Sequence, residues 1–324
     1  MKRSFVSGFA DDLNHMIDLK NSLKFSEKTY RDRAQDFDRF CTENYPKADE
    51  LMEPMVMNRL KQSTEKSDGS IHRKAAFARA FGRYQKSIGK AAYIIPESYT
   101  AGRNVFVPYI LGDKELAGLF HVIDTYEKPS NPFEPILLSV YFRLTYTCGL
   151  RPNEGRNLKR SEVDLNTGEV RIVNTKWHKS RTVVMSGDMH ALAKKYTAVR
   201  DAAFSDSEYF FPKADGDPYT ATCLGNKFRN FFALSNPDIP AELLPSVRVY
   251  DLRHRFATAV LNQWLDEKID LNARLPYLQT FMGHKEMEST AYYIHLLPEN
   301  LVKSAGIDWE SMNRLLPRVE LWEK

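Results

Sequence analysis

Apolar side chains recur at helical spacing through the first hundred residues of the chain. The segment that ends at Pro46 carries an apolar stripe with a period of three to four positions. This stripe consists of Tyr30, Ala34, Phe37, Phe40 and Cys41. A second helix is expected over 48–62 and, after a polar loop at 63–70, a third over about 71–88. The third helix keeps Arg and Lys on its outer face, and its buried stripe consists of Ala75, Ala78 and Phe81, with Tyr84 as a further candidate.

A different pattern begins near residue 113. Helical periodicity returns over seven segments, which are 113–126, 133–148, 188–202, 220–233, 251–266, 273–282 and 287–296. Between the second and third of these, β-branched residues alternate with polar ones and predict three short antiparallel strands. The strands are expected at 163–165, 169–173 and 181–185. A last amphipathic helix is expected over 308–322.

The segment 96–113 between the two regions contains two prolines and two glycines and is expected to be a linker. The sequence therefore predicts a mainly α fold with a small antiparallel sheet. It is divided into a helical domain over 1–105 and an α+β domain over 106–324. A length of 324 residues agrees with two domains.

Composition excludes several classes of protein. With 43% hydrophobic and 27% charged residues, the chain is an ordinary globular protein rather than a collagen, a rod or a disordered chain. No apolar run is long enough to predict a transmembrane helix. The three cysteines are far apart and form no CxxC pair, which argues against a disulfide framework and a zinc site. We therefore expect a reduced, cytoplasmic protein.

The net charge of +4 is unevenly distributed. Residues 1–105 hold 19 Lys and Arg against 14 Asp and Glu, whereas 106–324 hold 27 against 28. A basic excess in one domain favours a polyanionic partner such as nucleic acid. The same excess also fits an ordinary soluble surface, so charge alone leaves both interpretations open.

Four separated segments of the second domain carry side chains that suit phosphate chemistry. They are GLRPNE (149–154), the hairpin segment 174–181 with Lys176, YDLRH (250–254), and MGH (282–284) followed by Tyr292 and Tyr293. Arg253 lies near the start of a helix, where backbone N–H groups attract an anion, and a planar guanidinium can bind two phosphate oxygens. Each segment alone also has an ordinary interpretation, as an exposed arginine, a solvated charge run, a capped helix or a pair of core tyrosines.

The order and spacing of the four segments together resemble those of the tyrosine recombinase (phage integrase) family. The resemblance covers the second domain, and its matching stretches are GLRPNE, the hairpin lysine, YDLRHRFAT and MGHKEMESTAYYIH. It implies that Arg151 and Arg253 bind the phosphate and that Lys176 gives a proton to the leaving group. It also implies that His284 belongs to the phosphate site and that Tyr293, nine residues after it, is the nucleophile.

The resemblance further implies an activity and its partners. The implied activity is site-specific DNA recombination through a 3′-phosphotyrosine intermediate, as in integration, excision or resolution of a mobile DNA element. No cofactor, metal or membrane contact is implied. The implied partners are double-stranded DNA with an inverted-repeat core site and further copies of the chain in a tetramer, with 308–322 as a candidate docking helix. Residues 1–105 would be the helical core-binding domain, and 106–324 would be the α+β catalytic domain.

Two other functions stay open at this point. A type IB topoisomerase-like DNA-relaxing enzyme would share the chemistry but would act as a monomer. An inactive DNA-binding regulator is suggested by Tyr250, where the family usually has His or Lys. If Tyr250 is a catalytic residue, its phenol would donate a hydrogen bond to the phosphate. A phenol is, however, a poor general base. Formation of a covalent protein–DNA adduct would separate both enzymes from the regulator.

Overall fold

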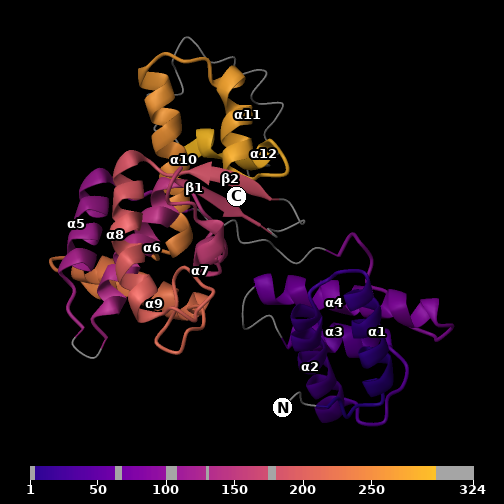
Figure 1. The fold of residues 1–324 in the computed structure, drawn as a ribbon. Coiled ribbons are helices and arrows are strands. Elements are labelled where there is room, and N and C mark those ends of the chain that lie inside the picture. Colours follow the sequence, from indigo (N-terminus) through magenta and orange to yellow (C-terminus); the bar gives the residue numbers. More distant parts are fainter. Residues whose placement is uncertain (1–3, 63–67, 100–107, 129–130, 174–179, 297–324) are drawn as a thin grey trace. The chain divides into compact units, whose positions relative to one another are not determined.

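Residues 4–62, 68–99, 108–128, 131–173 and 180–296 are described by a computed structural model, in which the chain falls into two units. One unit is Met1–Val107 and the other is Pro108–Lys324 (Figure 1). Helices dominate both units, as the apolar periodicity predicts.

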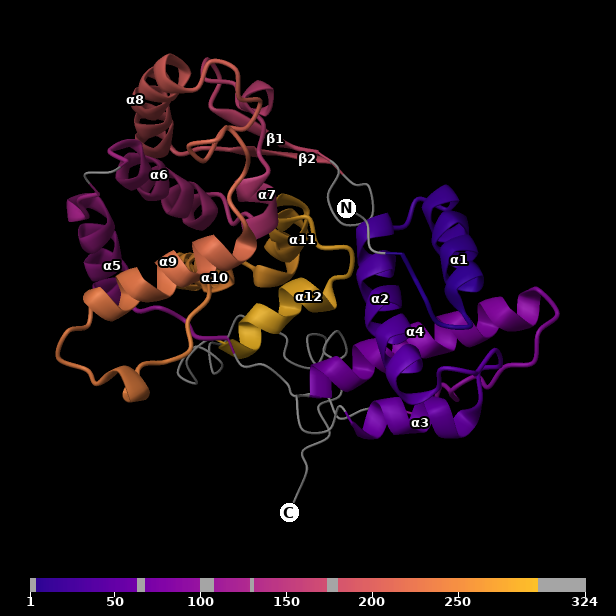
Figure 2. The ribbon, with the colours of Figure 1, turned by 90° about the horizontal axis from the view of Figure 1, so that it is seen from below.

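In the described part of the first unit, four helices pack around an aromatic core (Figure 2). They are α1 (Ala10–Ser22), α2 (Glu27–Asn44), α3 (Glu53–Lys61) and α4 (Asp68–Ser87). The ring of Phe81 lies 5.7 Å from that of Phe9 and 5.4 Å from that of Phe37, measured between centroids. The stripes predicted on α2 and α4 are the ones that face this core.

Two helix boundaries predicted in this unit were wrong. The helix expected over 48–62 begins at Glu53, because Pro54 is accommodated in the first turn of a helix but not deeper inside one. The loop expected over 63–70 is too long, because α4 already begins at Asp68.

In the described part of the second unit, α6 forms the centre of the main core. The helices there are α5 (Asp113–Thr125), α6 (Phe133–Thr147), α7 (Pro152–Arg156), α8 (Gly187–Ala203), α9 (Ala221–Leu234), α10 (Val249–Asp266), α11 (Leu271–Met282) and α12 (Glu288–Ala291). Helix α6 buries eight of its 15 residues and packs against α5, α8 and α10. This explains why its sequence is apolar on nearly every side.

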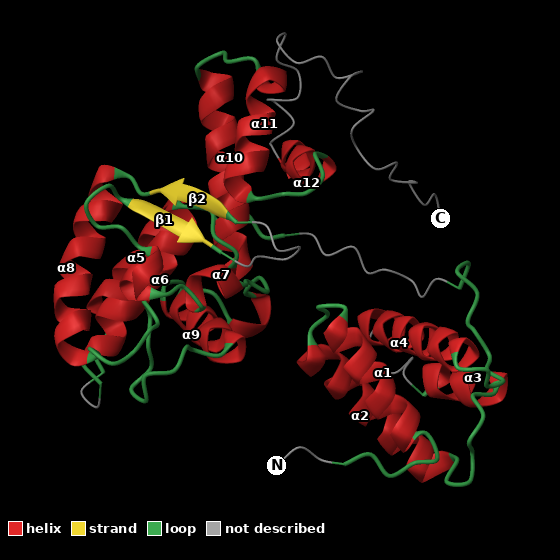
Figure 3. Cartoon of the chain, turned by 45° about the vertical axis from the view of Figure 1, so that its right-hand side comes forward, coloured by secondary structure: helices red, strands yellow, loops and turns green. Residues whose placement is uncertain are grey.

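The small sheet has two strands in the described residues rather than the three predicted (Figure 3). Strand β1 (Glu169–Ile172) pairs antiparallel with β2 (Arg181–Val184). The strand expected over 163–165 is reduced to one bridge between Val163 and Val170, because a tight turn follows at once and leaves no residues for further pairing.

A smaller apolar cluster lies beyond the main core, where α11 and α12 pack near α10 at one end of the unit (Figures 1 and 3). We call it the terminal cluster, and its buried members are Ala257, Leu261, Leu271, Leu275, Leu278, Met282, Tyr293 and Ile294. The single helix expected over 287–296 was wrong, because α12 ends at Ala291 and the chain continues as the 3₁₀ helix Tyr292–Leu296. Two consecutive residues of this 3₁₀ helix, Tyr293 and Ile294, are both buried in the cluster.

Three predictions fall wholly or partly outside the described residues. They concern the linker at 96–113, the hairpin tip at 174–179 and the helix at 308–322. Of the helices that the structure does describe, none combines the length and the apolar character needed to span a bilayer.

Candidate active site

Arg151 is placed by a sharp turn at the end of α6. Gly149 has a φ of +55°, and a Cβ atom there would lie 2.5 Å from the ring of Phe256, so glycine is required. Arg151 is the N-cap residue of α7, and its backbone N–H donates to Glu154 Oε2 at 2.9 Å. Pro152 follows at the start of the helix, where proline is favoured. The GLRPNE segment is thus a turn joined to a capped helix start, with Arg151 fixed at the junction.

Two arginines share the carboxylate of Glu154. Arg181, on β2, donates from Nη1 to Oε1 at 3.0 Å and from Nη2 to Oε2 at 2.7 Å. Arg151 donates from Nη1 to Oε1 at 2.7 Å and from Nη2 to the Gly283 carbonyl at 2.7 Å. Burial alone would raise the pKa of Glu154, but the hydrogen bonds and charges of the arginines outweigh it and hold that pKa at about 2. Glu154 is therefore ionised at neutral pH and joins the two arginines.

Arg253 is completely buried on α10. Its Nη1 donates to the Gly149 carbonyl at 2.5 Å, and its Nη2 donates to the Met282 carbonyl at 2.7 Å. The same Nη2 lies 2.9 Å from Nε2 of His284. Burial lowers the pKa of the guanidinium, which nevertheless stays charged at neutral pH. The turn at Gly149 and the MGH segment therefore hold this side chain from two directions.

His284 is held in one tautomer by its two partners. A guanidinium has donors only, so the His284 Nε2 that faces Arg253 must accept, and the ring proton must lie on Nδ1. Nδ1 then donates to Thr290 Oγ1 at 2.8 Å. Burial, followed by the positive charges of Arg253, Arg151 and Arg181, lowers the pKa of His284 to about 3. The imidazole is therefore neutral at pH 7.

Tyr293 is buried beside these groups. It is 2% exposed, and its ring stacks on that of His284 with centroids 6.1 Å apart and planes 15° apart. Burial raises the pKa of Tyr293 to about 12, and the positive charge of Arg253 opposes that rise. The neighbouring Tyr292 is half-buried, and burial raises its pKa as well. Of the two tyrosines, Tyr293 is the one whose ring packs against His284.

Tyr250 lies one helical turn before His254, on the same face of α10. Their ring centroids are 5.0 Å apart, and the His254 ring lies 5.5 Å from that of Tyr293. His254 Nδ1 is buried without a hydrogen-bond partner in the described residues. Burial, together with the charges of Arg248 and Arg253, lowers the pKa of His254 to about 4. Tyr250 and His254 therefore bring two rings to the wall of the site beside Tyr293.

These side chains converge on one groove of about 640 Å³. It is lined by Arg151, Tyr250, His254, Gly283, His284, Lys285, Glu286, Glu288, Ser289, Tyr292 and Tyr293. Arg253 does not line the groove but reaches it through its contact with His284. Five of the six site residues expected from the sequence thus lie together, and the sixth, Lys176, is outside the described residues. Within the described ranges, no group of three or more His, Cys, Asp or Glu is arranged to hold a metal ion.

Four further side chains complete the site but were not among the site residues predicted from the sequence. They are Glu154, Arg181, His254 and Thr290. The spacing of Glu154, three residues after Arg151, indicates a side chain that can bind the local backbone or an arginine, and the structure shows both contacts. No local pattern marks Arg181, because its partner lies 27 residues away along the chain.

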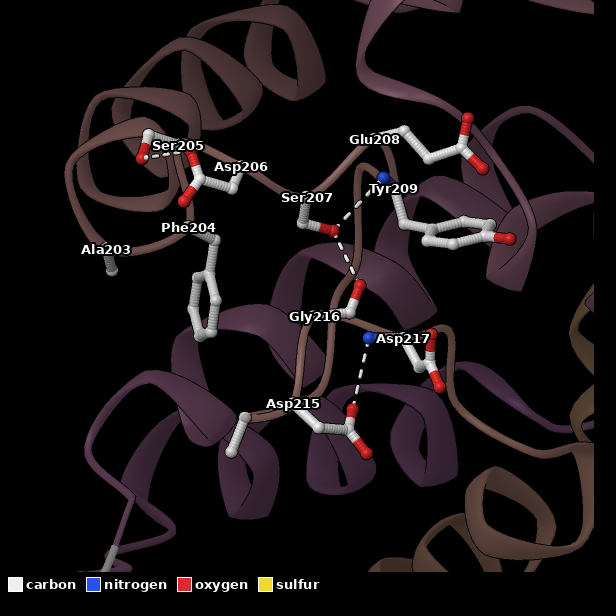
Figure 4. Close-up of a pocket in the computed structure, with 11 residues that line it drawn as sticks. Ala203, Phe204, Ser205, Asp206, Ser207, Glu208, Tyr209, Asp215, Gly216 and Asp217 are labelled. Carbon is white, nitrogen blue, oxygen red and sulfur yellow. Dashed lines mark hydrogen bonds between the residues drawn. The ribbon is translucent and has the colours of Figure 1, made fainter.

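A second hollow, of about 550 Å³, lies elsewhere in the same unit (Figure 4). Its two loops, 203–209 and 214–217, are tied together where Ser207 Oγ donates to the Gly216 carbonyl at 2.7 Å. Four acidic side chains line it, namely Asp206, Glu208, Asp215 and Asp217. An acidic surface repels a phosphodiester, and none of the predicted site residues lines this hollow. The groove at Tyr293 is therefore the candidate active site.

Comparison with known proteins identifies the family. The model of the phage integrase family matches residues 111–300. The y4rB protein of Sinorhizobium fredii, named as an integrase/recombinase, is 30% identical over 257 residues, which is 76% of this chain and 77% of that protein. The y4rE protein of the same organism, also named as an integrase/recombinase, is 31% identical over 199 residues, which is 61% of this chain and 63% of that protein. This second match therefore spans less than two thirds of the relative.

Solved structures share the fold. The XerH site-specific recombinase bound to its difH substrate has a TM-score of 0.63 at 17% identity, covering 88% of this chain and 81% of that chain. The Tn1549 transposon integrase in complex with transposon right-end DNA has a TM-score of 0.64 at 14% identity, covering 94% of this chain and 99% of that chain. Identities this low establish the fold alone. With the family match over 111–300 and the similarity to y4rB, however, the chain belongs to the phage integrase family, the tyrosine-type site-specific recombinases.

Proposed function

We propose that this recombinase cleaves and rejoins DNA strands with Tyr293 as its nucleophile. The observation that supports the proposal is that Tyr293, a neutral histidine and one arginine line the same groove, while a second arginine lies behind it in contact with the histidine. The arginines are Arg151 and Arg253, and the histidine is His284. A phosphodiester in this groove would meet fixed positive charge next to a buried phenol.

The proposed step is a displacement at phosphorus. Tyr293 Oη forms a bond to the phosphorus atom and loses its proton, while the bond from phosphorus to the 5′ oxygen breaks. That oxygen takes up a proton, for which Lys176 is the expected donor. The products are a 3′-phosphotyrosyl bond and a free 5′-hydroxyl. Attack by a 5′-hydroxyl on the phosphotyrosyl bond reverses the step and rejoins a strand without a nucleotide cofactor.

The raised pKa of Tyr293 indicates what the arginines must supply. With a pKa of about 12, roughly one phenol in 10⁵ is ionised at pH 7, a deficit of about 7 kcal/mol. Arg151 and Arg253 would lower the free energy of the charge-rich pentavalent transition state. Both are already held by backbone carbonyls, at Gly283, Gly149 and Met282, so they need little rearrangement when the phosphate arrives.

The proposed substrate is double-stranded DNA with an inverted-repeat core site in a mobile or resolvable element, acted on by a tetramer in the cytoplasm. The XerH and Tn1549 structures are complexes with DNA, and lambda integrase has been solved as a tetramer bound to a Holliday junction. We assign 1–105 to core-site binding and 106–324 to catalysis, with 308–322 as the docking helix between protomers. Resolution of a synthetic Holliday junction would separate recombination from topoisomerase-like relaxation.

Covalent capture on duplexes of random sequence tests the nucleophile and selects the DNA site in one experiment. The wild-type protein is incubated with nicked random duplexes, and DNA that stays attached in denaturing detergent is recovered and sequenced. We expect capture of duplexes that share a core sequence. The nick lets the short fragment that carries the new 5′-hydroxyl diffuse away, so the strand cannot be rejoined and the adduct is trapped.

Two variants identify the attacking oxygen on the selected duplex. Tyr293→Phe should bind it and form no adduct, since one oxygen is removed and the ring is kept. Tyr292→Phe is the matched control and should still form the adduct. If Tyr292→Phe abolished the adduct and Tyr293→Phe retained it, the nucleophile would be Tyr292.

A further inference from the structure

We propose that Arg181 is a positioning residue for the phosphate-binding Arg151 and that it acts through Glu154. This inference rests on the proposed function and concerns how the same groove keeps its positive charge. Arg181 lies at the start of β2 and is the last residue of the hairpin segment 174–181, in which only Lys176 was predicted as a site residue.

Arg181 joins three elements with one side chain. Both of its terminal nitrogens donate to the two Glu154 oxygens, at 3.0 and 2.7 Å, and its Nε donates to the Phe281 carbonyl at 2.8 Å. The side chains of Arg181 and Glu154 are each 8% exposed, so water contributes little to either. A bidentate pair of this kind fixes the plane of the carboxylate as well as its position. The carboxylate in turn receives both the backbone N–H and Nη1 of Arg151.

The charges explain why a second arginine is needed. Glu154 and Arg151 alone would form a neutral pair, and the carboxylate would offset the positive charge that a phosphate requires. Arg181 neutralises the carboxylate from its other side, so the three side chains together carry one net positive charge. Glu154 can then orient Arg151 without cancelling the positive charge that Arg151 presents to a phosphate.

Gly283 leaves room for this arrangement. A Cβ atom there would lie 3.0 Å from both Cδ and Nη1 of Arg181, and its φ of +65° disfavours any side chain. The carbonyl of the same glycine accepts from Nη2 of Arg151 at 2.7 Å. The MGH turn thus makes space for one arginine while its backbone binds the other.

A double-mutant cycle tests the inference on the duplex selected by covalent capture. We expect Arg181→Gln to slow single-turnover adduct formation about 10²-fold while DNA affinity changes less than about threefold, because Arg181 does not line the groove at Tyr293. Glu154→Gln should slow it about tenfold. The double variant should be no slower than Arg181→Gln and should approach Glu154→Gln, because without the carboxylate there is no charge left to neutralise.

Two further variants keep the outcome decisive. Arg143→Gln removes an arginine that also donates from both nitrogens to one carboxylate, that of Asp124, away from the groove, and it should leave the rate unchanged. Arg181→Lys keeps the charge but loses the planar fork, and should recover part of the rate lost in Arg181→Gln. If Arg181→Gln does not fold, Arg181→Lys takes its place in the cycle.

The results separate failure of the inference from failure of the proposed function. If the wild-type protein forms the adduct but the rate losses of the two single variants multiply in the double variant, Arg181 does not act through Glu154, and the inference is overturned. A loss of DNA affinity as large as the loss of rate would assign Arg181 to DNA contact instead. Absence of an adduct from the wild-type protein would overturn the proposed function itself.

Discussion

Protonation of His254 should destabilise the second unit, Pro108–Lys324, below pH 6.5. Burial, and then the charges of Arg248 and Arg253, lowers the pKa of His254 to about 4, whereas an unfolded chain leaves it near 6.5. Between these values the unfolded state binds the proton and the folded state does not. The stabilisation is therefore complete above pH 6.5 and is lost as the pH falls toward 4.

The expected size of the effect follows from the two pKa values. Lowering the pH from 7 to 5 should cost about 2 kcal/mol of unfolding free energy through this residue. His254→Phe removes the titrating group and keeps an aromatic ring between those of Tyr250 and Tyr293. His254 Nδ1 has no hydrogen-bond partner in the described residues, so the substitution sacrifices no bond from that atom. The variant should be about as stable as wild type at pH 7 and about 2 kcal/mol more stable at pH 5.

Tryptophan fluorescence during urea unfolding measures this difference in the full chain. All four tryptophans follow residue 107, so they report on the second unit, and Trp264 lies on α10 with His254. His121→Phe, at an exposed position of α5, controls for the loss of one histidine. If wild type and His254→Phe lose the same unfolding free energy between pH 7 and pH 5, the folded protein accepts the proton at His254 as readily as the unfolded chain does. That result would refute the lowered pKa of His254.

Five further substitutions, at four positions, test the site. Arg151→Ala and Arg253→Ala should each slow adduct formation about 10²-fold. Arg253→Ala should also lower the free energy of urea unfolding by about 3 kcal/mol, because two buried carbonyls lose their charged donor. Equal stabilities of the two variants would contradict the buried role of Arg253. Tyr250→Phe should slow adduct formation about tenfold through the lost donor, and Tyr250→His should stay within about tenfold of wild type; a silent Phe with a destabilised His would remove Tyr250 from the site. Gly149→Ala should destabilise the second unit by about 3 kcal/mol, because the new methyl group clashes with Phe256 at a positive φ, and an unchanged urea midpoint would refute this.

The sequence predicts the helices well because their signals are local. The apolar stripes of α2 and α4 repeat at a fixed period, and burial of one face enforces that period in the folded chain. In two places where the prediction was wrong, a local feature of the chain overrode the pattern. Pro54 delays the start of α3, and the tight turn after Val163 prevents a third strand from forming.

The motif spacing identified the candidate site residues but not their contacts. Arg151 and Arg253 are both arginines in recognisable segments, yet one is 23% exposed at the groove and the other is completely buried behind it. That difference is set by carbonyls at Gly149 and Met282, which lie 104 and 29 residues from Arg253 along the chain. A one-dimensional pattern carries no record of such pairings, and the same is true of Arg181.

The terminal cluster makes the proposed nucleophile, Tyr293, and the arginines of the site depend on one small core. Tyr293 belongs to this cluster, whereas Arg151 follows directly on Leu150 of the main core, and the stacked rings of Phe256 and Phe281 join the two. A small satellite cluster opens at a lower free energy than the core beside it, so amide hydrogens of α11 should exchange with solvent sooner than those of α6. Such an opening would move Tyr293 together with the Phe281, Met282 and Gly283 carbonyls that bind Arg181, Arg253 and Arg151. It would therefore take apart the proposed nucleophile and the proposed phosphate site in a single event.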